Sequence, residues 1–406
     1  MTPEELQLSL HDTEWAYTYT DHDRLIARAI VVDDAGMFYF VRAVRNDEFG
    51  NATLIETSGG GVEPGEDLQD AIRRELKEEL GAETEILCKI GMVSDTYNLI
   101  HRHNLNHYYL CRIRSFGEKH LTEDEIERFH LSTLRLTFDE AVAEYEARAT
   151  TPLGRLLRQR ELPVLCRAKE LLTILRRTCF LTSATTIPCT NTLNPANGFL
   201  DALRQRFPKD CRALFVCSDP DHSDVTDYYA AETKAGFEEA GFAFASFDVL
   251  DGRNAAETNA LVAGSDCIIL AGGHVPTQNR FFQRIGLKDA LRGFGGILIT
   301  ISAGTMNCAE TVYAQPEEPG EATDPAYRRF LPGLGLTETM LLPHYQAYKD
   351  YTVDGLRVYE DITYADSFGR TFVAIPDGSY LLIENGVETL HGEAFAIRDG
   401  VLTKIQ

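Results

Sequence analysis

Residues 60–82 read GGVEPGEDLQDAIRRELKEELGA, and this stretch decides the fold of the first half of the chain. An apolar residue recurs every four positions and predicts an amphipathic helix over about 67–80 with one buried face. The residues of that face are Leu68, Ile72, Leu76 and Leu80. At about 100° per residue, Glu75, Glu78 and Glu79 lie in an arc beside it. Neighbouring carboxylates repel one another unless a cation lies among them, and oxygen ligands suit Mg²⁺ or Mn²⁺.

The spacing of these residues is that of the Nudix box, and residues 1–176 resemble a Nudix hydrolase domain. A solvated charged helix face explains a short acidic segment equally well, but here seven positions match together. The resemblance implies an α/β/α sandwich with a mixed sheet. It also implies Mg²⁺- or Mn²⁺-dependent hydrolysis of a nucleoside diphosphate linked to another group.

The same resemblance gives roles to individual residues. Glu75, Glu78 and Glu79 match the metal-binding glutamates, and the carbonyl of Gly60 is expected to join them. Glu78 is also the expected catalytic glutamate, although the base lies outside the box in some members. Arg74 lies one helical turn before Glu78 and is expected to orient a carboxylate.

The substrate of this domain stays open at this point. Enzymes that act on ADP-ribose usually carry a proline shortly beyond the box, where this chain has Asp95, Thr96 and Tyr97. A tyrosine there resembles enzymes for dinucleoside polyphosphates, and packing of Tyr97 inside a strand is the alternative. His101, His103 and His107 suggest a metal site, but they lie in a polar stretch and are expected to be solvated loop residues.

The second half of the chain shows a different order of predicted strands and helices. Short apolar segments alternate with helical patterns, which predicts a doubly wound, largely parallel sheet and an α/β class. Residues 295–301 form a buried strand that stops at Ser302, and a helix is predicted over 305–314. A serine in a sharp turn between strand and helix is the arrangement of a nucleophile elbow.

Two further features accompany this serine. Gly273 follows another apolar strand, and its N–H group and that of Ala303 are candidates for an oxyanion hole. His344 follows an apolar run 42 residues beyond the serine and is the candidate base. The sequence therefore predicts a serine hydrolase site in the second half.

These features resemble the peptidase E and cyanophycinase-like serine hydrolases over about 178–406, a branch of the class I glutamine amidotransferase-like fold. The resemblance implies Ser302 as nucleophile, His344 as base and Glu317 as the acid, with Glu318 as a close rival. It further implies cleavage of short peptides, with aspartyl peptides as the expected substrates. Thr300 and His274 replace the usual glycine and asparagine, and a catalytically silent copy of the fold is the alternative.

Composition limits the partners. Lys and Arg number 39 against 62 Asp and Glu, and the resulting charge of −23 disfavours binding to a nucleic acid. Nine cysteines without a C-x-x-C pair favour free thiols in a reducing cytoplasm. We see no signal peptide and no membrane span in the sequence, and we expect a cytoplasmic protein, with a monomer and an oligomer both left open.

The expectation is thus a bifunctional hydrolase with a domain at 1–176 and another at 178–406. Its partners would be a nucleotide-derived small molecule and a short peptide, with Mg²⁺ or Mn²⁺ as cofactor. The alternative has one active domain, with the other serving as a regulatory ligand-binding or scaffolding module.

Overall fold

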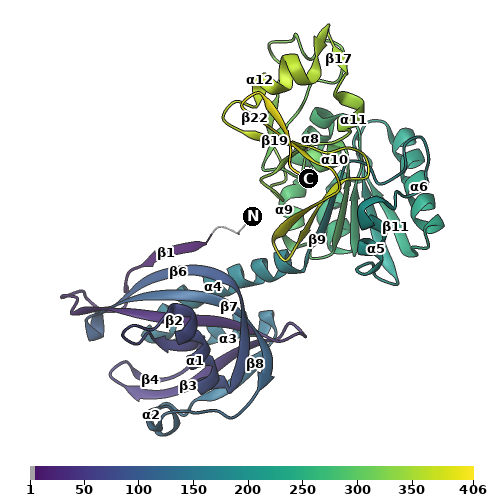
Figure 1. Ribbon diagram of the computed structural model, residues 1–406. Helices are drawn as coiled ribbons and strands as arrows, with labels where there is room; N and C mark the ends of the chain where they lie inside the picture. The colour runs from purple at the N-terminus through teal and green to yellow at the C-terminus, as the bar shows by residue number, and fades with distance from the viewer. Residues whose placement is uncertain (1–4) are drawn as a thin grey trace. The chain divides into compact units, whose positions relative to one another are not determined.

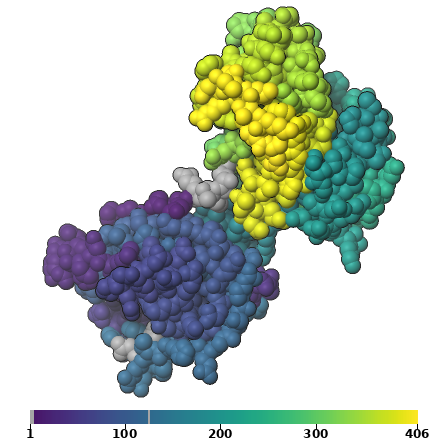
Figure 2. All heavy atoms as spheres, viewed as in Figure 1, coloured from purple at the N-terminus to yellow at the C-terminus, as the bar shows by residue number. Residues whose placement is uncertain are grey.

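The computed structural model describes residues 5–406, apart from the side chains of residues 124 and 125. The chain divides into two compact units, one reaching to Leu172 and the other running from Thr173 to Gln406. Figures 1 and 2 show the first unit in purple and blue and the second in teal to yellow. In the described part of the chain, no helix combines the length and apolar character needed to cross a membrane.

The first unit is built on an eight-stranded mixed sheet with the order β1-β6-β7-β2-β3-β4, to which β5 and β8 are added on β2 and β3. Its strands are β1 (Leu6–Leu10), β2 (His22–Val32), β3 (Phe38–Asp47), β4 (Gly50–Glu56), β5 (Ser58–Gly61), β6 (Ala82–Tyr97), β7 (Arg102–Phe116) and β8 (Ser132–Leu136). Its helices are α1 (Leu68–Leu80), α2 (Glu123–Glu127), α3 (Phe138–Arg148) and α4 (Pro152–Arg176), with a 3₁₀ turn at Asn98–Ile100.

Helices cover both faces of this sheet, as the predicted sandwich requires. Ala27 and Val31 of β2 pack with Ile72 and Leu76 of α1 on one face. On the other face, apolar residues of α4 pack around Tyr97. Strand β6 contributes to both cores, with Ala82 in the first and Tyr97 in the second.

One local expectation is wrong in this unit. His103 and His107 do not lie in a loop, because they belong to strand β7, whereas His101 lies in the turn before that strand. This strand forms a long antiparallel pair with β6, in which His103 is opposite Thr96 and His107 is opposite Met92. The polar residues of this segment suggested a loop, but the segment is a strand that pairs with β6, the strand before it in the chain.

The second unit contains a seven-stranded sheet with the order β11-β10-β12-β13-β9-β20-β21. Its strands are β9 (Thr178–Thr182), β10 (Cys211–Val216), β11 (Phe244–Leu250), β12 (Cys267–Leu270), β13 (Ile297–Ile301), β20 (Tyr380–Glu384) and β21 (Val387–His391). The first five strands of this order are parallel, and β20 and β21 are antiparallel.

Helices and small sheets surround that central sheet. The helices are α5 (Phe199–Arg204), α6 (Ser223–Glu239), α7 (Thr258–Ala263), α8 (Val275–Arg284), α9 (Leu287–Ala290), α10 (Ala303–Met306), α11 (Tyr345–Tyr348) and α12 (Tyr364–Asp366). The smaller sheets are β14 (Thr311–Tyr313) with β15 (Phe330–Pro332), β17 (Thr352–Val353) with β18 (Leu356–Arg357), and β16 (Met340–Leu342), β19 (Thr371–Ala374), β22 (Phe395–Arg398) and β23 (Val401–Lys404) in that order.

The central sheet is covered on both faces, which confirms the doubly wound class. Ile268 of β12 belongs to a core that contains Phe281 of α8, whereas its neighbour Ile269 belongs to a second core with Phe237 of α6. Strands buried on both faces consist of continuous apolar residues, and the sequence of the second half has short segments of this kind.

The helix predicted over 305–314 is mostly absent. Helix α10 covers only Ala303–Met306, and the chain then returns as strand β14. The β-branched residues Thr311 and Val312 pair with Pro332 and Leu331 of β15, which removes this part of the segment from the helix.

Candidate active sites

Helix α1 has well-defined ends that fix the position of its glutamates. Asp67 caps the first turn by accepting a hydrogen bond from the Gln69 N–H at 2.8 Å. Gly81 ends the helix with φ 65°, in the left-handed region that glycine tolerates best. Because its apolar face is buried against the sheet, helix α1 cannot rotate about its axis, and the neighbouring glutamates stay on one side of it.

Arg74 ties the acidic residues of this region together. Its Nη1 lies 2.8 Å from Glu75 Oε1 and 3.3 Å from Glu78 Oε2. Its other nitrogens contact the Glu66 carboxylate at 2.9 and 3.0 Å, and Nη2 also donates to the carbonyl of Gly61. The hydrogen bond from Arg74 lowers the pKa of Glu66. The arginine therefore holds three glutamates of the box, two of which are predicted metal ligands.

The remaining predicted ligands lie in the same corner. The Glu79 carboxylate is 8% exposed and accepts a hydrogen bond from the Gly59 N–H at 3.1 Å. The Glu75 carboxylate lies directly over Gly60, where an added Cβ would be 2.7 Å from its Cδ atom. A side chain at that position would push the Glu75 carboxylate aside, so glycine allows Glu75 to keep this place.

The donor chemistry of this corner fits Mg²⁺ or Mn²⁺. All the candidate ligands are oxygen atoms, namely three carboxylates and the Gly60 carbonyl, which suits a hard divalent cation. Among the described His, Cys, Asp and Glu residues, however, ligand atoms gather within 4.8 Å only at His274, Glu318 and Glu321. The box carboxylates are less tightly grouped, and Arg74 bridges two of them.

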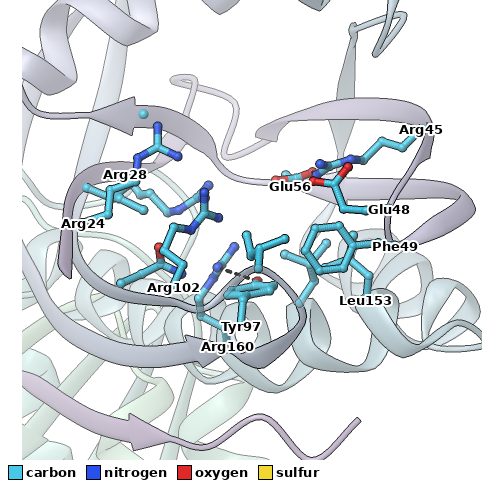
Figure 3. A pocket seen from close by; sticks show the side chains of 15 residues that line it. Arg24, Arg28, Arg45, Glu48, Phe49, Glu56, Tyr97, Arg102, Leu153 and Arg160 are labelled. Carbon is cyan, nitrogen blue, oxygen red and sulfur yellow. Dashed lines mark hydrogen bonds and ion pairs between the residues drawn. The ribbon is translucent and has the colours of Figure 1, made fainter. Parts of the chain in front are cut away.

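A cavity of about 130 Å³ includes Gly60 in its wall and is lined by several arginines (Figure 3). The arginines are Arg24, Arg28, Arg45, Arg102 and Arg160. Tyr97 also lines the cavity, is 4% exposed, and accepts a hydrogen bond from Arg160 Nη1 at 3.0 Å. Tyr97 is therefore packed inside the fold and also forms part of the cavity wall, so the structure agrees with both alternatives that the sequence left open.

The arginines were not identified from the sequence. A signal for them is present in β2, where Arg24 and Arg28 lie four residues apart and so share one face of the strand.

In the second unit, Ser302 occupies the sharp turn after β13. Its backbone has φ 50° and ψ −111°, a conformation that L-residues rarely adopt and that marks stored strain. A Cβ on Gly272 would be 3.3 Å from the Ser302 Cβ, and one on Gly304 would be 2.7 Å from the Leu270 carbonyl oxygen. The turn is therefore packed tightly against the end of strand β12.

His344 follows strand β16 and has an acidic partner. Its Nδ1 lies 2.6 Å from Asp377 Oδ1. Strands β16 and β19 are parallel neighbours with Leu342 opposite Ala374, so the loops that follow them meet at the same edge. Ser183 links the two, because its hydroxyl donates to Asp377 and accepts from the His344 N–H, both at 2.8 Å.

The charge of Asp377 is stabilised by these contacts. Burial by itself raises the pKa of this carboxyl. The hydrogen bond and charge of His344 and the hydrogen bonds from Ser183 and Gln346 lower the pKa by more, so it lies below its usual value. The Asp377 carboxylate is therefore well suited to hold the imidazole in one orientation.

This partner differs from the acid expected in the sequence analysis. Glu317 accepts hydrogen bonds from Tyr348 at 3.3 Å and from the Val275 N–H at 3.4 Å, and Glu318 is exposed. The structure corrects the assignment of Glu317 or Glu318 as partner of His344 to Asp377. The reason is topological, because a parallel neighbour strand brings Asp377 to the histidine from 33 residues away.

Ser302, His344 and Gly273 line a common cavity of about 610 Å³. Its wall carries the hydroxyl and amide groups of Thr185, Thr186 and Asn191, and also acidic residues, but none of its lining side chains is Lys or Arg. Ala303, the second oxyanion candidate, directly follows the serine and is 1% exposed.

Comparison with models of known families matches residues 22–154 to the NUDIX domain and residues 179–390 to peptidase family S51. The chain has no match among curated proteins. Among solved structures, a NUDIX hydrolase from Nitrosomonas europaea is 20% identical, with 34% of this chain and 87% of that chain covered and a TM-score of 0.28.

Two further solved structures match. A peptidase from an acI-B1 Actinobacterium is 16% identical, with 56% of this chain and 93% of that chain covered and a TM-score of 0.38. A MutT NUDIX hydrolase from Burkholderia pseudomallei is 22% identical, with 29% of this chain and 86% of that chain covered and a TM-score of 0.24. Since the S51 model spans more than half of the 406 residues, the chain belongs to peptidase family S51, and it carries a NUDIX domain ahead of its peptidase domain.

Proposed function

We propose that this two-domain hydrolase has two working sites. Residues 1–176 hydrolyse a phosphoanhydride in a nucleoside diphosphate derivative with Mg²⁺ or Mn²⁺, and residues 178–406 cleave a short peptide through Ser302. The observation that supports the first activity best is the arginine-lined cavity beside the box glutamates. For the second, it is the strained serine in one cavity with a His344–Asp377 pair.

In the NUDIX domain, Glu75, Glu78, Glu79 and the Gly60 carbonyl would hold the metal. When bound there, such an ion polarises a phosphoryl oxygen and lowers the pKa of water. Arg74 keeps the Glu75 and Glu78 carboxylates in place through its hydrogen bonds. The side chain of Glu78 is 39% exposed, which leaves its carboxylate accessible to take a proton from the attacking water.

In the peptidase domain, Ser302 Oγ forms a bond to the peptide carbonyl carbon while its proton passes to Nε2 of His344. The N–H groups of Gly273 and Ala303 donate to the oxyanion. The C–N bond then breaks, and the imidazolium gives its proton to the leaving amine. Water repeats the sequence on the acyl-enzyme and releases the acid, while Asp377 keeps the ring oriented through Nδ1.

Aspartyl peptides remain the proposed substrates because of the family resemblance. No Lys or Arg lines the 610 Å³ cavity, so neutral donors would have to bind the aspartyl carboxylate. The side chains of Thr185, Thr186 and Asn191 would serve as these donors. Kinetic comparison of Asp-, Asn- and Lys-initiated dipeptides tests this. The highest kcat/KM is expected for the aspartyl peptide, and a preference for lysine would reject this specificity.

A screen of the pure full-length chain tests both activities. Nucleoside diphosphate derivatives and dipeptides are incubated with and without Mg²⁺, and products are separated by chromatography. We expect metal-dependent release of phosphate-containing products and metal-independent peptide cleavage. Absence of one activity, with modulation of the other by that domain's ligands, would favour the regulatory-module alternative.

A further inference from the structure

We propose that His274 and Glu321 are positioning residues of the serine site, and that the contact between their side chains keeps the N–H group of Gly273 directed at the oxyanion. This inference rests on the proposed peptidase function and goes beyond it, because neither residue has a part in the reaction described above. His274 stands where the family resemblance expects an asparagine. This departure from the family pattern therefore has a role in the reaction.

The turn that carries the Gly273 N–H group has an unusual backbone. It connects strand β12 to helix α8, and Gly273 has φ 150°, a conformation that residues other than glycine rarely adopt. A Cβ on Gly273 would lie 2.4 Å from Ser218 Oγ, so one side of the turn is packed against that serine. Because glycine is conformationally permissive, the direction of its N–H group depends on the contacts that hold its neighbours.

The residue after this glycine is held at both ring nitrogens. His274 Nδ1 lies 2.8 Å from Thr277 Oγ1, and His274 Nε2 lies 2.7 Å from Glu321 Oε1. The Thr277 oxygen also accepts a hydrogen bond from Arg280 Nη2 at 3.0 Å. The Thr277 hydroxyl hydrogen is thus free to bond to Nδ1, and Nε2 donates to Glu321. Since the side chains of His274 and Glu321 are only 21% and 13% exposed, water competes little for this contact.

The carboxylate that accepts from His274 is itself anchored to the backbone. Glu321 Oε2 accepts hydrogen bonds from the N–H groups of Glu317 and Glu318 at 2.9 and 3.0 Å. Both oxygens of this carboxylate are therefore in use, and hydrogen bonds to an ionised acceptor are among the strong ones. The Glu321 side chain thus ties the loop at 317–321 to the turn that contains Gly273.

The His274–Glu321 pair acts on the serine site without entering it. Gly273 lines both cavities that contain Ser302 and His344. In the part of the chain that the structure describes, His274 and Glu321 line neither cavity. An oxyanion-hole donor must lie about 2.7–3.1 Å from the developing charge. A small shift of the turn would therefore weaken binding of the transition state and leave binding of the substrate nearly unchanged.

Side-chain length allows a matched test at position 274 in the full chain. Asparagine is too short to reach Glu321, whereas glutamine carries an N–H₂ group as many bonds from Cβ as Nε2 of histidine. With Asp-Ala as substrate, we expect His274→Asn to lower kcat about 10–100-fold and to change KM less than about twofold. His274→Gln should stay within about threefold of the wild type. Glu321→Gln leaves one oxygen for three donors and should resemble His274→Asn.

A second measurement separates positioning from loss of structure. Ser302 Oγ adds to the carbonyl carbon of an aspartyl aldehyde while its proton passes to His344, and the aldehyde oxygen becomes an oxyanion. The matched ligand is Asp-Ala with a reduced CH₂–NH bond, which has no oxygen for the oxyanion hole. In His274→Asn the inhibition constant of the aldehyde should rise about as much as kcat/KM falls, and that of the reduced peptide should stay unchanged. Lys404→Gln, which breaks an exposed ion pair with Glu393, is the control for both ligands.

The outcomes separate this inference from the proposed function. If the wild type cleaves Asp-Ala but His274→Asn keeps its kcat and its affinity for the aldehyde, the positioning role is rejected and the function stands. Equal weakening of both ligands in His274→Asn, or no recovery in His274→Gln, indicates a structural role and also overturns the inference. If the wild type neither cleaves Asp-Ala nor binds the aldehyde, the aspartyl peptidase function is rejected and the inference falls with it.

Discussion

The two cavities of this chain differ most in charge. The cavity of the NUDIX domain is lined by five arginines, although acidic residues outnumber basic ones by 62 to 39 in the whole chain. The larger cavity around Ser302 has no Lys or Arg among its lining residues. Cations are thus gathered where a phosphate-bearing ligand would bind, whereas the serine site depends on backbone strain and on one histidine–aspartate pair.

Apart from the nucleophile and the metal ligands, the largest single-residue effect on this contrast is expected at Asp377. Asp377→Asn removes the acceptor for His344 Nδ1 and should lower kcat for peptide cleavage by about 10²–10⁴-fold, since the wrong tautomer is then favoured. Glu317→Gln is the control, and a change of only a few fold is expected. Steady-state kinetics decides between them. A larger loss in Glu317→Gln than in Asp377→Asn would restore Glu317 as the acid.

The second prediction concerns the close approach at Gly60. In Gly60→Ala the new methyl group would collide with the Glu75 carboxylate and shift it away from the box. Metal-dependent phosphoanhydride hydrolysis should fall by about 10–100-fold, as for a displaced ligand-orienting contact. Gly117→Ala, where the nearest atom would be 3.8 Å away, serves as the control. Equal activities of the two variants would remove Gly60 from the site.

A smaller effect is expected from acid. Because the pKa of Asp377 is lower in the folded chain than in the unfolded chain, its carboxylate stabilises the peptidase domain above the unfolded pKa. That contribution is lost as pH falls through the folded pKa. Thermal unfolding of residues 178–406 between pH 2 and 6 should therefore show a steeper decline for the wild type than for Asp377→Asn. Parallel curves would contradict the charge assignment.

The smallest effect is expected from separating the domains. Pieces 1–176 and 178–406 each contain a core of their own. Both should unfold cooperatively, with midpoints within a few degrees of the corresponding transitions of the full chain. Circular dichroism during heating measures this, and an unfolded piece at neutral pH would refute the independence of the domains.

Local patterns allowed much of the fold to be predicted. The strands β2 and β3, the capped helix α1 and the helix Phe138–Arg148 follow from runs of residues that are close in sequence. The helix expected over 305–314 failed because pairing with β15 decides the structure of Thr311–Tyr313. The periodicity of a sequence does not show which distant strand a segment pairs with.

The candidate sites show the same limit. The box glutamates are predictable because they lie on one helix. Ser302 is predictable because an apolar strand and a turn directly precede and contain it. Asp377 and the arginines were missed because strand neighbours bring them into place. His344 and Asp377 are 33 residues apart, and Arg24 and Arg102 are 78 apart.

The central claim is that one chain holds two separate hydrolytic sites, and one measurement tests it directly. Phosphoanhydride and peptide hydrolysis are assayed side by side in Ser302→Ala, Glu79→Gln and the wild type. We predict that Ser302→Ala loses peptide cleavage by orders of magnitude and keeps phosphoanhydride hydrolysis, and that Glu79→Gln does the reverse. Loss of both activities in either variant, or of neither, would contradict the account.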